Sequence, residues 1–322
     1  MPLVKRSNFY RRPWFLLNAH METIIPSIFF KIDNDPYSRE RLEMDDGDFL
    51  DLDWIKSMHN RRLLIISHGL EGSSERYYVK RPAIYFSQSG WDVLAWNCRS
   101  CSGVMNRLPR FYHHGDTDDL ARVVDQALSK NYDSVVLMGF SMGGSMSIKY
   151  LGERNPDPSV SGAITFSVPC DLKDSSDQLE KNGNAIYRKR FLSKLRVKMQ
   201  TKAVSHPDHI DVEGIDDVRD FDTFHERFTA PLHGFDSVSD FFTQATCGPY
   251  LESLSRPVLV GNALNDPLLG PACYPFEAAK RSKQLFLETP RSGGHVGFTM
   301  KGTAYSWMEL RAETFIDEII SR

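Results

Sequence analysis

Nearly continuous apolar runs alternate along most of the chain with segments long enough to form helices. Such runs are typical of strands that are buried on both faces of a parallel sheet. The expected strands are residues 63–67, 91–97, 134–140, 161–168, 257–264 and 284–288. The expected helices are residues 76–87, 118–130, 142–153, 271–280 and 303–321. This alternation predicts an α/β protein with a mostly parallel central sheet and helices on both of its faces.

Two segments near the start of the chain depart from this alternation. Residues 42–54 alternate in polarity around Asp46-Gly47, a dipeptide that is typical of tight turns, and therefore predict a β-hairpin. Residues 1–40 are rich in aromatic residues and prolines and show no clear period. We interpret residues 1–40 as an arm that is packed on the body of the protein.

A longer departure covers residues 171–250, which are highly charged and mixed in polarity. One helix with an apolar face is predicted there, because apolar side chains recur at every fourth position. They are Tyr187, Phe191, Leu195 and Met199. A basic block surrounds that face, formed by Arg188, Lys189, Arg190, Lys194, Arg196, Lys198 and Lys202. An acidic block follows, formed by Asp208, Asp211, Glu213, Asp216, Asp217, Asp220, Asp222 and Glu226. We interpret residues 171–250 as an inserted, mainly helical cap whose solvated basic block pairs with the acidic one.

The composition of the 322 residues is ordinary for a soluble globular protein, with 41% hydrophobic and 25% charged residues. The net charge of -3 lacks the basic excess that nucleic-acid-binding proteins usually show. The five cysteines are scattered and odd in number, so we expect no disulfide framework and a cytoplasmic, reducing location. No apolar run approaches the ~20 residues that cross a bilayer, and the first residues lack the apolar region of a secretory signal.

Residues 139–143 form a Gly-x-Ser-x-Gly pattern with Ser141 at its centre. An expected strand leads into the pattern and an expected helix leads out of it, which is the strand–turn–helix setting of a nucleophile elbow. The turn is tight, and Gly139 and Gly143 provide the small residues that it needs. The alternative is a glycine-rich turn in which Ser141 has no chemical role. We predict that Ser141 is a catalytic nucleophile.

A serine nucleophile needs a base, and a histidine late in the chain is the expected one. His295 lies in a glycine-rich loop after the last expected strand. Asp266 follows the strand expected at residues 257–264 and is suited to orient the imidazole, although a turn-forming role before Pro267 is the alternative. The chain order Ser141, Asp266, His295 is that of α/β-hydrolases and differs from the orders of two other classes of serine hydrolase. We therefore predict that these three residues form a catalytic triad.

The oxyanion that such a reaction creates needs two backbone N–H donors. One donor belongs to the residue after the nucleophile, and the other belongs to the loop after an early strand. We nominate the N–H groups of Met142 and Leu70 as this oxyanion hole.

The positions of the predicted triad also decide the domain organisation. Its serine precedes residues 171–250, whereas its acid and its base follow them. The triad can assemble only if residues 1–170 and 251–322 contribute to the same sheet. We therefore predict one discontinuous catalytic domain, with residues 171–250 inserted as a cap, instead of two consecutive domains.

Residues 98–101 read Cys-Arg-Ser-Cys, a spacing that occurs in redox and zinc sites. Neither a second such pair nor histidines at metal-ligand spacing accompany it. We interpret Cys98 and Cys101 as thiols of a loop near the pocket. The predicted chemistry requires no metal and no organic cofactor.

Several longer motifs resemble the YheT-like family of the α/β-hydrolase superfamily, to which the eukaryotic ABHD1/ABHD3-type esterases are related. Residues 18–26 (Asn-Ala-His-Met-Glu-Thr-Ile-Ile-Pro) are similar to a signature near the start of that family, and residues 68–74 are similar to its oxyanion loop. Residues 97–103, 106–107 and 112–115 resemble its central block. The first of these three reads Asn-Cys-Arg-Ser-Cys-Ser-Gly, where the family most often has Asn-His-Arg-Gly-Cys-Ser-Gly.

The resemblance implies a serine-dependent carboxylic-ester hydrolase that acts through Ser141, Asp266 and His295. The implied substrates, and the only partners expected, are small acyl esters with short to medium chains or small lipids. Two alternatives stay open, which are acyl transfer to an alcohol by the same triad and a non-catalytic binding module on a hydrolase scaffold. We expect no nucleic-acid partner and no integral membrane segment, while peripheral lipid contact through the basic block and the oligomeric state stay open.

Overall fold

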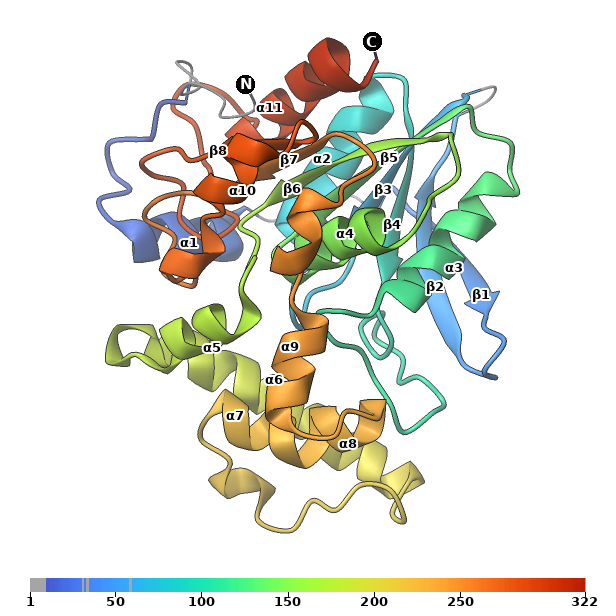
Figure 1. Cartoon of the computed structure of the whole chain (residues 1–322), viewed down its shortest axis with the longest axis vertical. Helices are drawn as coiled ribbons and strands as arrows, with labels where there is room; N and C mark the ends of the chain where they lie inside the picture. Colours follow the sequence, from blue (N-terminus) through green and yellow to red (C-terminus); the bar gives the residue numbers. More distant parts are fainter. Residues whose placement is uncertain (1–9, 31, 33–34, 58–59, 322) are drawn as a thin grey trace.

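One sheet of eight strands forms the centre of the computed structural model, which describes residues 10–30, 32, 35–57 and 60–321 (Figure 1). The strand order is β1-β2-β4-β3-β5-β6-β7-β8. β2 is antiparallel to both β1 and β4, and all the other neighbours run parallel, which confirms the predicted mostly parallel sheet. The strands are β1 Ser38–Glu43, β2 Phe49–Ile55, β3 Arg62–Ser67, β4 Asp92–Asn97, β5 Ser134–Phe140, β6 Val160–Phe166, β7 Val258–Gly261 and β8 Leu285–Glu288.

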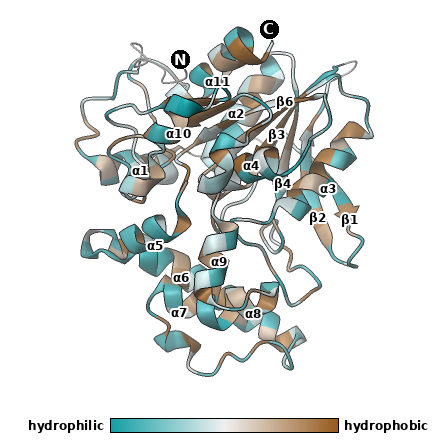
Figure 2. Cartoon of the chain, viewed as in Figure 1, coloured by the Kyte–Doolittle hydropathy of each residue, from teal (hydrophilic) through white to brown (hydrophobic). Residues whose placement is uncertain are grey.

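Helices cover both faces of the sheet, as predicted (Figure 1). α3 and α4 contribute Val123 and Met146 to the apolar cluster on one face, and α2 and α11 contribute Phe86 and Trp307 to the cluster on the other. Figure 2 shows hydrophobic residues gathered in the strands between these layers. The helices are α2 Tyr77–Gln88, α3 Thr117–Leu128, α4 Met142–Glu153, α10 Phe276–Arg281 and α11 Trp307–Phe315.

The expected arm contains a helix that the sequence pattern does not reveal. α1 spans Ala19–Phe29, and the Asn18 side chain caps its start by accepting a hydrogen bond from the N–H of Met21 at 2.9 Å. Pro26 lies inside this helix and disguises the helical period, because proline normally ends or bends a helix. Residues 1–9 of the arm lie outside the described part of the chain.

The predicted β-hairpin is confirmed by the antiparallel pairing of β1 with β2. The alternating carboxylates of β2 do not face solvent. Asp51 and Asp53 are buried, and each pairs with the arginine directly across the ladder. Arg41 Nε lies 2.8 Å from Asp51, and Arg39 Nε lies 2.7 Å from Asp53.

Residues 171–250 form several helices that lie together below the sheet in Figure 1. They are α5 Leu172–Glu180, α6 Ala185–Ser205, α7 Phe221–Phe224, α8 Ala230–His233 and α9 Val238–Ala245. α6 contains the predicted apolar face, of which Phe191 is half-buried and the other three members are buried. The assignment of the whole segment as a cap domain stays a prediction.

The basic block of α6 does not pair with the acidic block as expected. Among the described residues, no ion pair joins the two blocks, and Arg196 instead donates a hydrogen bond to a backbone carbonyl oxygen, that of Asp216. Lys198 and Lys202 are buried rather than solvated. Their ammonium groups bind loops that follow strands of the sheet. Lys198, for example, lies 2.6 Å from the carboxylate of Glu71, and these acceptors are far away in the sequence.

A buried ion cluster joins the β-hairpin to the loop after β4 and to α3. The guanidinium of Arg99 lies 2.7 Å from a carboxylate oxygen of Asp48 and 2.7 Å from one of Asp119. All three side chains are at most 2% exposed. A buried ion pair adds little net stability over apolar packing, but removal of one partner leaves an uncompensated buried charge.

We predict that Arg99→Met lowers the free energy of unfolding by about 3–5 kcal/mol, because Asp48 and Asp119 lose their shared cation. Urea denaturation measures this change. The control is Arg61→Met, whose pair with Asp133 has both side chains more than 60% exposed; that change should leave the free energy of unfolding nearly unchanged. Equal effects of the two substitutions would contradict the role given to Arg99.

Candidate active site

Ser141 occupies a strained turn between β5 and α4. Its φ of 53° and ψ of -118° lie in a region that residues with side chains rarely adopt. The backbone is held there by the Ser141 N–H, which donates to the carbonyl oxygen of Phe166 at 2.9 Å. A side chain at Gly143 would overlap the carbonyl oxygen of Ser67, so this turn tolerates only glycine at that position. This is the geometry that places a serine hydroxyl at the edge of a parallel sheet.

The structure brings Ser141, Asp266 and His295 together. His295 Nε2 lies 3.0 Å from Ser141 Oγ, and His295 Nδ1 lies 2.9 Å and 3.1 Å from the two carboxylate oxygens of Asp266. Asp266 is 5% exposed and His295 is 8% exposed. One neutral tautomer fits both contacts, because Nδ1–H can donate to the carboxylate while Nε2 accepts from the hydroxyl. This arrangement can move a proton from the serine to the histidine.

α1 supports the loop that carries His295. The Thr23 hydroxyl oxygen accepts a hydrogen bond from the N–H of His295 at 2.9 Å, and a Glu22 carboxylate oxygen accepts one from the N–H of Gly293. Asn265, in the loop after β7, also holds the loop of His295, because its side-chain oxygen accepts a hydrogen bond from the N–H of Gly294 at 3.1 Å. The sequence prediction assigned no role to Glu22 or Thr23. The only signal was their place in the 18–26 motif.

The two predicted oxyanion donors lie beside the serine. Met142 begins α4, and Leu70 lines the same cavity as Ser141. The N–H groups on both sides of Leu70 are bound to tyrosines, since Gly69 donates to Tyr78 and Glu71 donates to Tyr112. No acceptor within the described ranges takes the N–H of Leu70 or Met142. Both groups are therefore free to bind a developing oxyanion, and their role stays a prediction.

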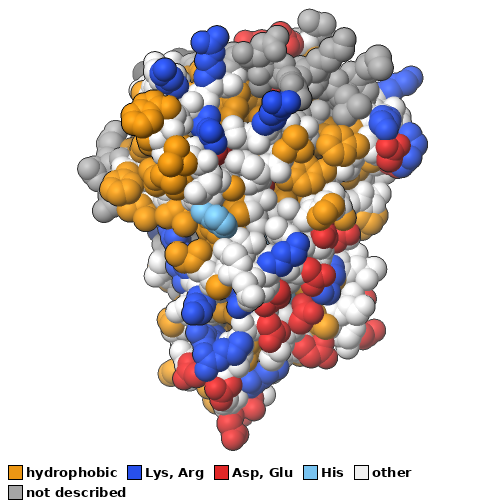
Figure 3. All heavy atoms as spheres, turned by 90° about the vertical axis from the view of Figure 1, so that its left-hand side faces the viewer, with side chains coloured by type: hydrophobic (Ala, Val, Ile, Leu, Met, Phe, Trp, Pro, Cys, Tyr) orange, Lys and Arg blue, Asp and Glu red, His pale blue; other side chains and the backbone are white. Residues whose placement is uncertain are grey.

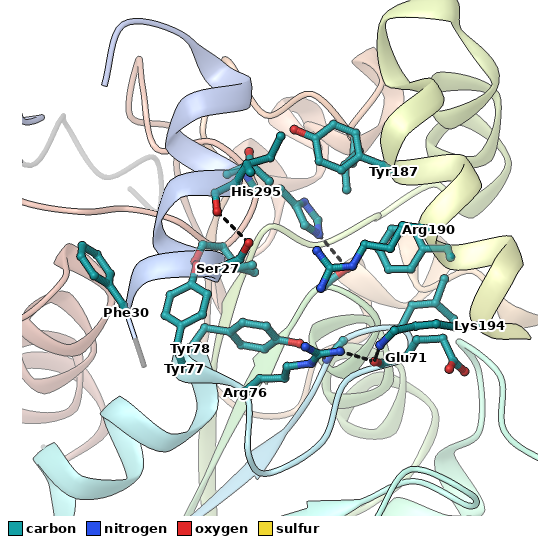
Figure 4. A pocket seen from close by; sticks show the side chains of 18 of the residues that line it. Ser27, Phe30, Glu71, Arg76, Tyr77, Tyr78, Tyr187, Arg190, Lys194 and His295 are labelled. Carbon is teal, nitrogen blue, oxygen red and sulfur yellow. Dashed lines mark hydrogen bonds between the residues drawn. The ribbon is translucent and has the colours of Figure 1, made fainter. Parts of the chain in front are cut away.

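A cavity of about 350 Å³ opens beside Ser141 and is walled by α1, α2 and α6 (Figure 4). Phe30 and Tyr77 form an aromatic wall, with ring centres 6.4 Å apart. Figure 3 shows the outer surface on this side of the molecule, where hydrophobic side chains gather in the upper half, most acidic ones lie in the lower half, and Lys and Arg lie in both. The arm and α1 carry five large side chains that are 46–78% exposed, which are Trp14, Phe15, Leu17, Ile28 and Phe29.

A second, polar cavity contains three groups that could hold a metal ion. The ligand atoms of His113, Asp116 and His233 lie within 4.8 Å of one another. Two of these groups already have protein partners, because Arg110 binds Asp116 at 3.3 Å and the N–H of Gly115 donates to His113 Nδ1. Burial also lowers the pKa of His113 to about 3. This cavity shares no lining residue with the one beside Ser141.

The Cys-Arg-Ser-Cys segment has neither a disulfide nor a place among the groups that could bind metal in the described part of the chain. Burial raises the pKa of Cys101 to about 11 and that of Cys98 well above its ordinary value. Burial thus disfavours the thiolate, which is the reactive form of a cysteine.

Comparison with known proteins finds similarity to esterases and lipases. A family model described as serine aminopeptidase, S33, matches residues 58–269. YheT of Escherichia coli strain K12, named as a candidate esterase, is 30% identical over 306 residues, which cover 91% of this chain and 88% of YheT. Phospholipase ABHD3 of Homo sapiens is 27% identical, with coverage of 89% and 71%. Monoacylglycerol lipase of Saccharomyces cerevisiae is 27% identical, with coverage of 79% and 58%.

Solved structures show the same fold at low sequence identity. The esterase Pf2001 of Pyrococcus furiosus has a TM-score of 0.57 at 18% identity, over 88% of this chain and 91% of that one. The α/β hydrolase GrgF of Penicillium sp. sh18 has a TM-score of 0.57 at 15% identity, over 89% of this chain and 100% of that one. These similarities confirm the predicted α/β-hydrolase fold. Among the described residues, no helix combines the length and the apolar character needed to pass through a membrane.

We predict that Glu22→Gln loosens the loop that carries His295. Glu22 is 1% exposed, and its carboxylate accepts hydrogen bonds from Gly293, Arg12 and Asn265. An amide must point its NH₂ group at one of these donors, so the free energy of unfolding should fall by about 1–3 kcal/mol. Hydrogen-exchange mass spectrometry should show faster exchange in residues 290–298.

The matched control for this prediction is Glu277→Gln. Glu277 is exposed and, within the described ranges, pairs with Lys280 alone, three residues along the chain, so both stability and exchange should stay unchanged. If Glu22→Gln exchanges at the rate of the unmodified protein, α1 does not hold the loop.

Proposed function

Since the chain belongs to the YheT-like family of α/β-hydrolases and is an enzyme of their esterase and lipase type, we propose that Ser141 is its nucleophile, His295 its general base and Asp266 the acid that orients the histidine. The observation that carries this proposal is the double contact of His295, which lies within hydrogen-bond distance of both partners. The burial of the carboxylate supports it further, because a buried anion stabilises the imidazolium that forms during the reaction.

The proposed reaction proceeds through an acyl-enzyme. Ser141 Oγ attacks the ester carbonyl carbon while its proton passes to His295 Nε2. The N–H groups of Leu70 and Met142 donate to the oxyanion. His295 then gives its proton to the leaving alcohol as the ester C–O bond breaks. Water, deprotonated by the same histidine, attacks the acyl group, and the carboxylic acid leaves as the proton returns to Ser141.

We propose acyl esters with short to medium chains, or small lipids, as the substrates. The cavity of about 350 Å³ is at the small end of the range for ligand pockets, and the rings of Phe30 and Tyr77 offer an apolar surface to an acyl chain. The names of similar proteins, an esterase, a phospholipase and a monoacylglycerol lipase, support a carboxylic ester as the bond that is cleaved.

We also propose that residues 171–250 act as a cap over this site. α6 presents Tyr187, Arg190, Phe191 and Lys194 to the cavity, and this spacing of three and four residues is that of one helical face. Residues 1–170 and 251–322 then form the catalytic domain. In this assignment the cap supplies one wall of the cavity and so influences which esters enter.

We predict that Ser141→Ala lowers kcat for p-nitrophenyl butyrate by about 10⁴-fold or more, because among the described residues no other hydroxyl lies within hydrogen-bond distance of the His295 imidazole to replace the nucleophile. Release of p-nitrophenol measures turnover, and the melting temperature checks the fold. The control is Ser27→Ala, which changes a serine that lines the same cavity and whose hydroxyl donates to the carbonyl oxygen of Ile24. A Ser141→Ala variant that still turns over this ester would remove Ser141 from the mechanism.

A further inference from the structure

Three cationic side chains line the cavity beside Ser141. Arg190 and Lys194 project from one face of α6, and Arg76 lies at the start of α2. Arg76 and Lys194 converge on a single atom, since both donate to the carbonyl oxygen of Glu71, at 3.0 Å and 3.2 Å. Figure 4 shows the three side chains on one side of the cavity and Phe30 on the other. The cavity therefore has one cationic wall and one aromatic wall.

None of the three cations pairs with a carboxylate among the described residues. The two acids of the cavity wall, Glu71 and Glu75, have other partners. The Glu71 carboxylate binds the ammonium of Lys198 at 2.6 Å, and the Glu75 carboxylate binds the ammonium of Lys80 at 2.5 Å. Within the described part of the chain, the cavity that contains Ser141 thus has three cations on its wall that no carboxylate pairs with.

The like charges of these three groups repel one another. Burial lowers the pKa of Lys194, and the neighbouring charges of Arg76 and Arg190 lower it further. An anion placed between the three groups would be attracted by all of them, in a partly desolvated site where such attraction is stronger than in water. Arginine is especially suited to bind carboxylate or phosphate through two parallel hydrogen bonds.

We propose that Arg76, Arg190 and Lys194 form an anion subsite, and that the enzyme prefers esters that carry a carboxylate or phosphate group close to the scissile bond. The inference rests on the proposed function, because it takes Ser141 as the point of attack. The aromatic wall of Phe30 and Tyr77 would receive the acyl chain, so the anionic group belongs to the alcohol portion. The substrate class is therefore an amphiphilic, anionic ester.

The test compares matched butyrate esters that differ in the charge of the alcohol portion. The neutral ester is methyl 4-(butyryloxy)benzoate, and the anionic ones are 4-(butyryloxy)benzoate and 4-(butyryloxy)phenyl phosphate. The ratio of kcat/KM for an anionic ester to that for the neutral one measures the subsite. We expect a ratio of about ten or more, larger for the phosphate, and a decline of the ratio with rising salt concentration.

Arg190→Met tests the subsite directly, because this exposed side chain has no hydrogen bond or ion pair to lose within the described part of the chain. The ratio should fall about tenfold or more, mainly through a higher KM for the anionic ester. The control is Lys189→Met, which removes an exposed neighbouring charge that does not line the cavity and should leave the ratio unchanged. Lys194→Met should lower the ratio as Arg190→Met does.

The outcomes separate the two proposals. A ratio near one in the unmodified enzyme, or equal effects of Arg190→Met and Lys189→Met, overturns the anion subsite while the hydrolase function stands. A preference for an ester with the charge on its acyl portion, such as p-nitrophenyl hemisuccinate, overturns the assignment of the anion to the alcohol. Full hydrolysis of all these esters by Ser141→Ala would instead overturn the proposed function.

Discussion

The parallel register of β5, β6, β7 and β8 fixes where their carboxyl ends lie, and the candidate site is built on the residues that follow those ends. Ser141 follows β5 directly, Asp266 lies in the loop after β7, and His295 lies in the loop after β8. A slip of one residue would turn every side chain of a strand to the opposite face. The hydrogen bonds of His295 at 2.9–3.1 Å therefore depend on the strand pairing that the apolar runs specify.

The sheet alone does not complete the site, because two helices from outside the sheet layers close around it. α1 holds the loop of His295 through Glu22 and Thr23. α6 supplies two of the three cations that line the cavity, Arg190 and Lys194. The two helices also meet each other, since the ring of His20 stacks on Tyr187 and its Nδ1 lies 3.0 Å from the tyrosine hydroxyl. The cavity is thus bounded by α1 and by a segment inserted between β6 and β7.

The sequence predicted the elements whose stability is local or whose burial is complete, and it missed those that depend on distant partners. Continuous apolar runs revealed the six parallel-sheet strands, and the order Ser141, Asp266, His295 identified residues that the fold then brought together. α1 escaped notice because Pro26 hides its period and its contacts are with loops far along the chain. The burial of Lys198 was equally hidden, because its partner Glu71 is 127 residues away. The catalytic roles and the domain boundaries stay predictions.

The central claim, that Ser141 is a nucleophile activated by His295, is tested most directly by covalent labelling. The unmodified protein would be treated with a fluorophosphonate, and the adduct would be located by peptide mass spectrometry. The account predicts one adduct per chain, on Ser141, formed far more slowly when His295 is replaced by alanine. An adduct on another residue, or equal labelling without His295, would contradict it.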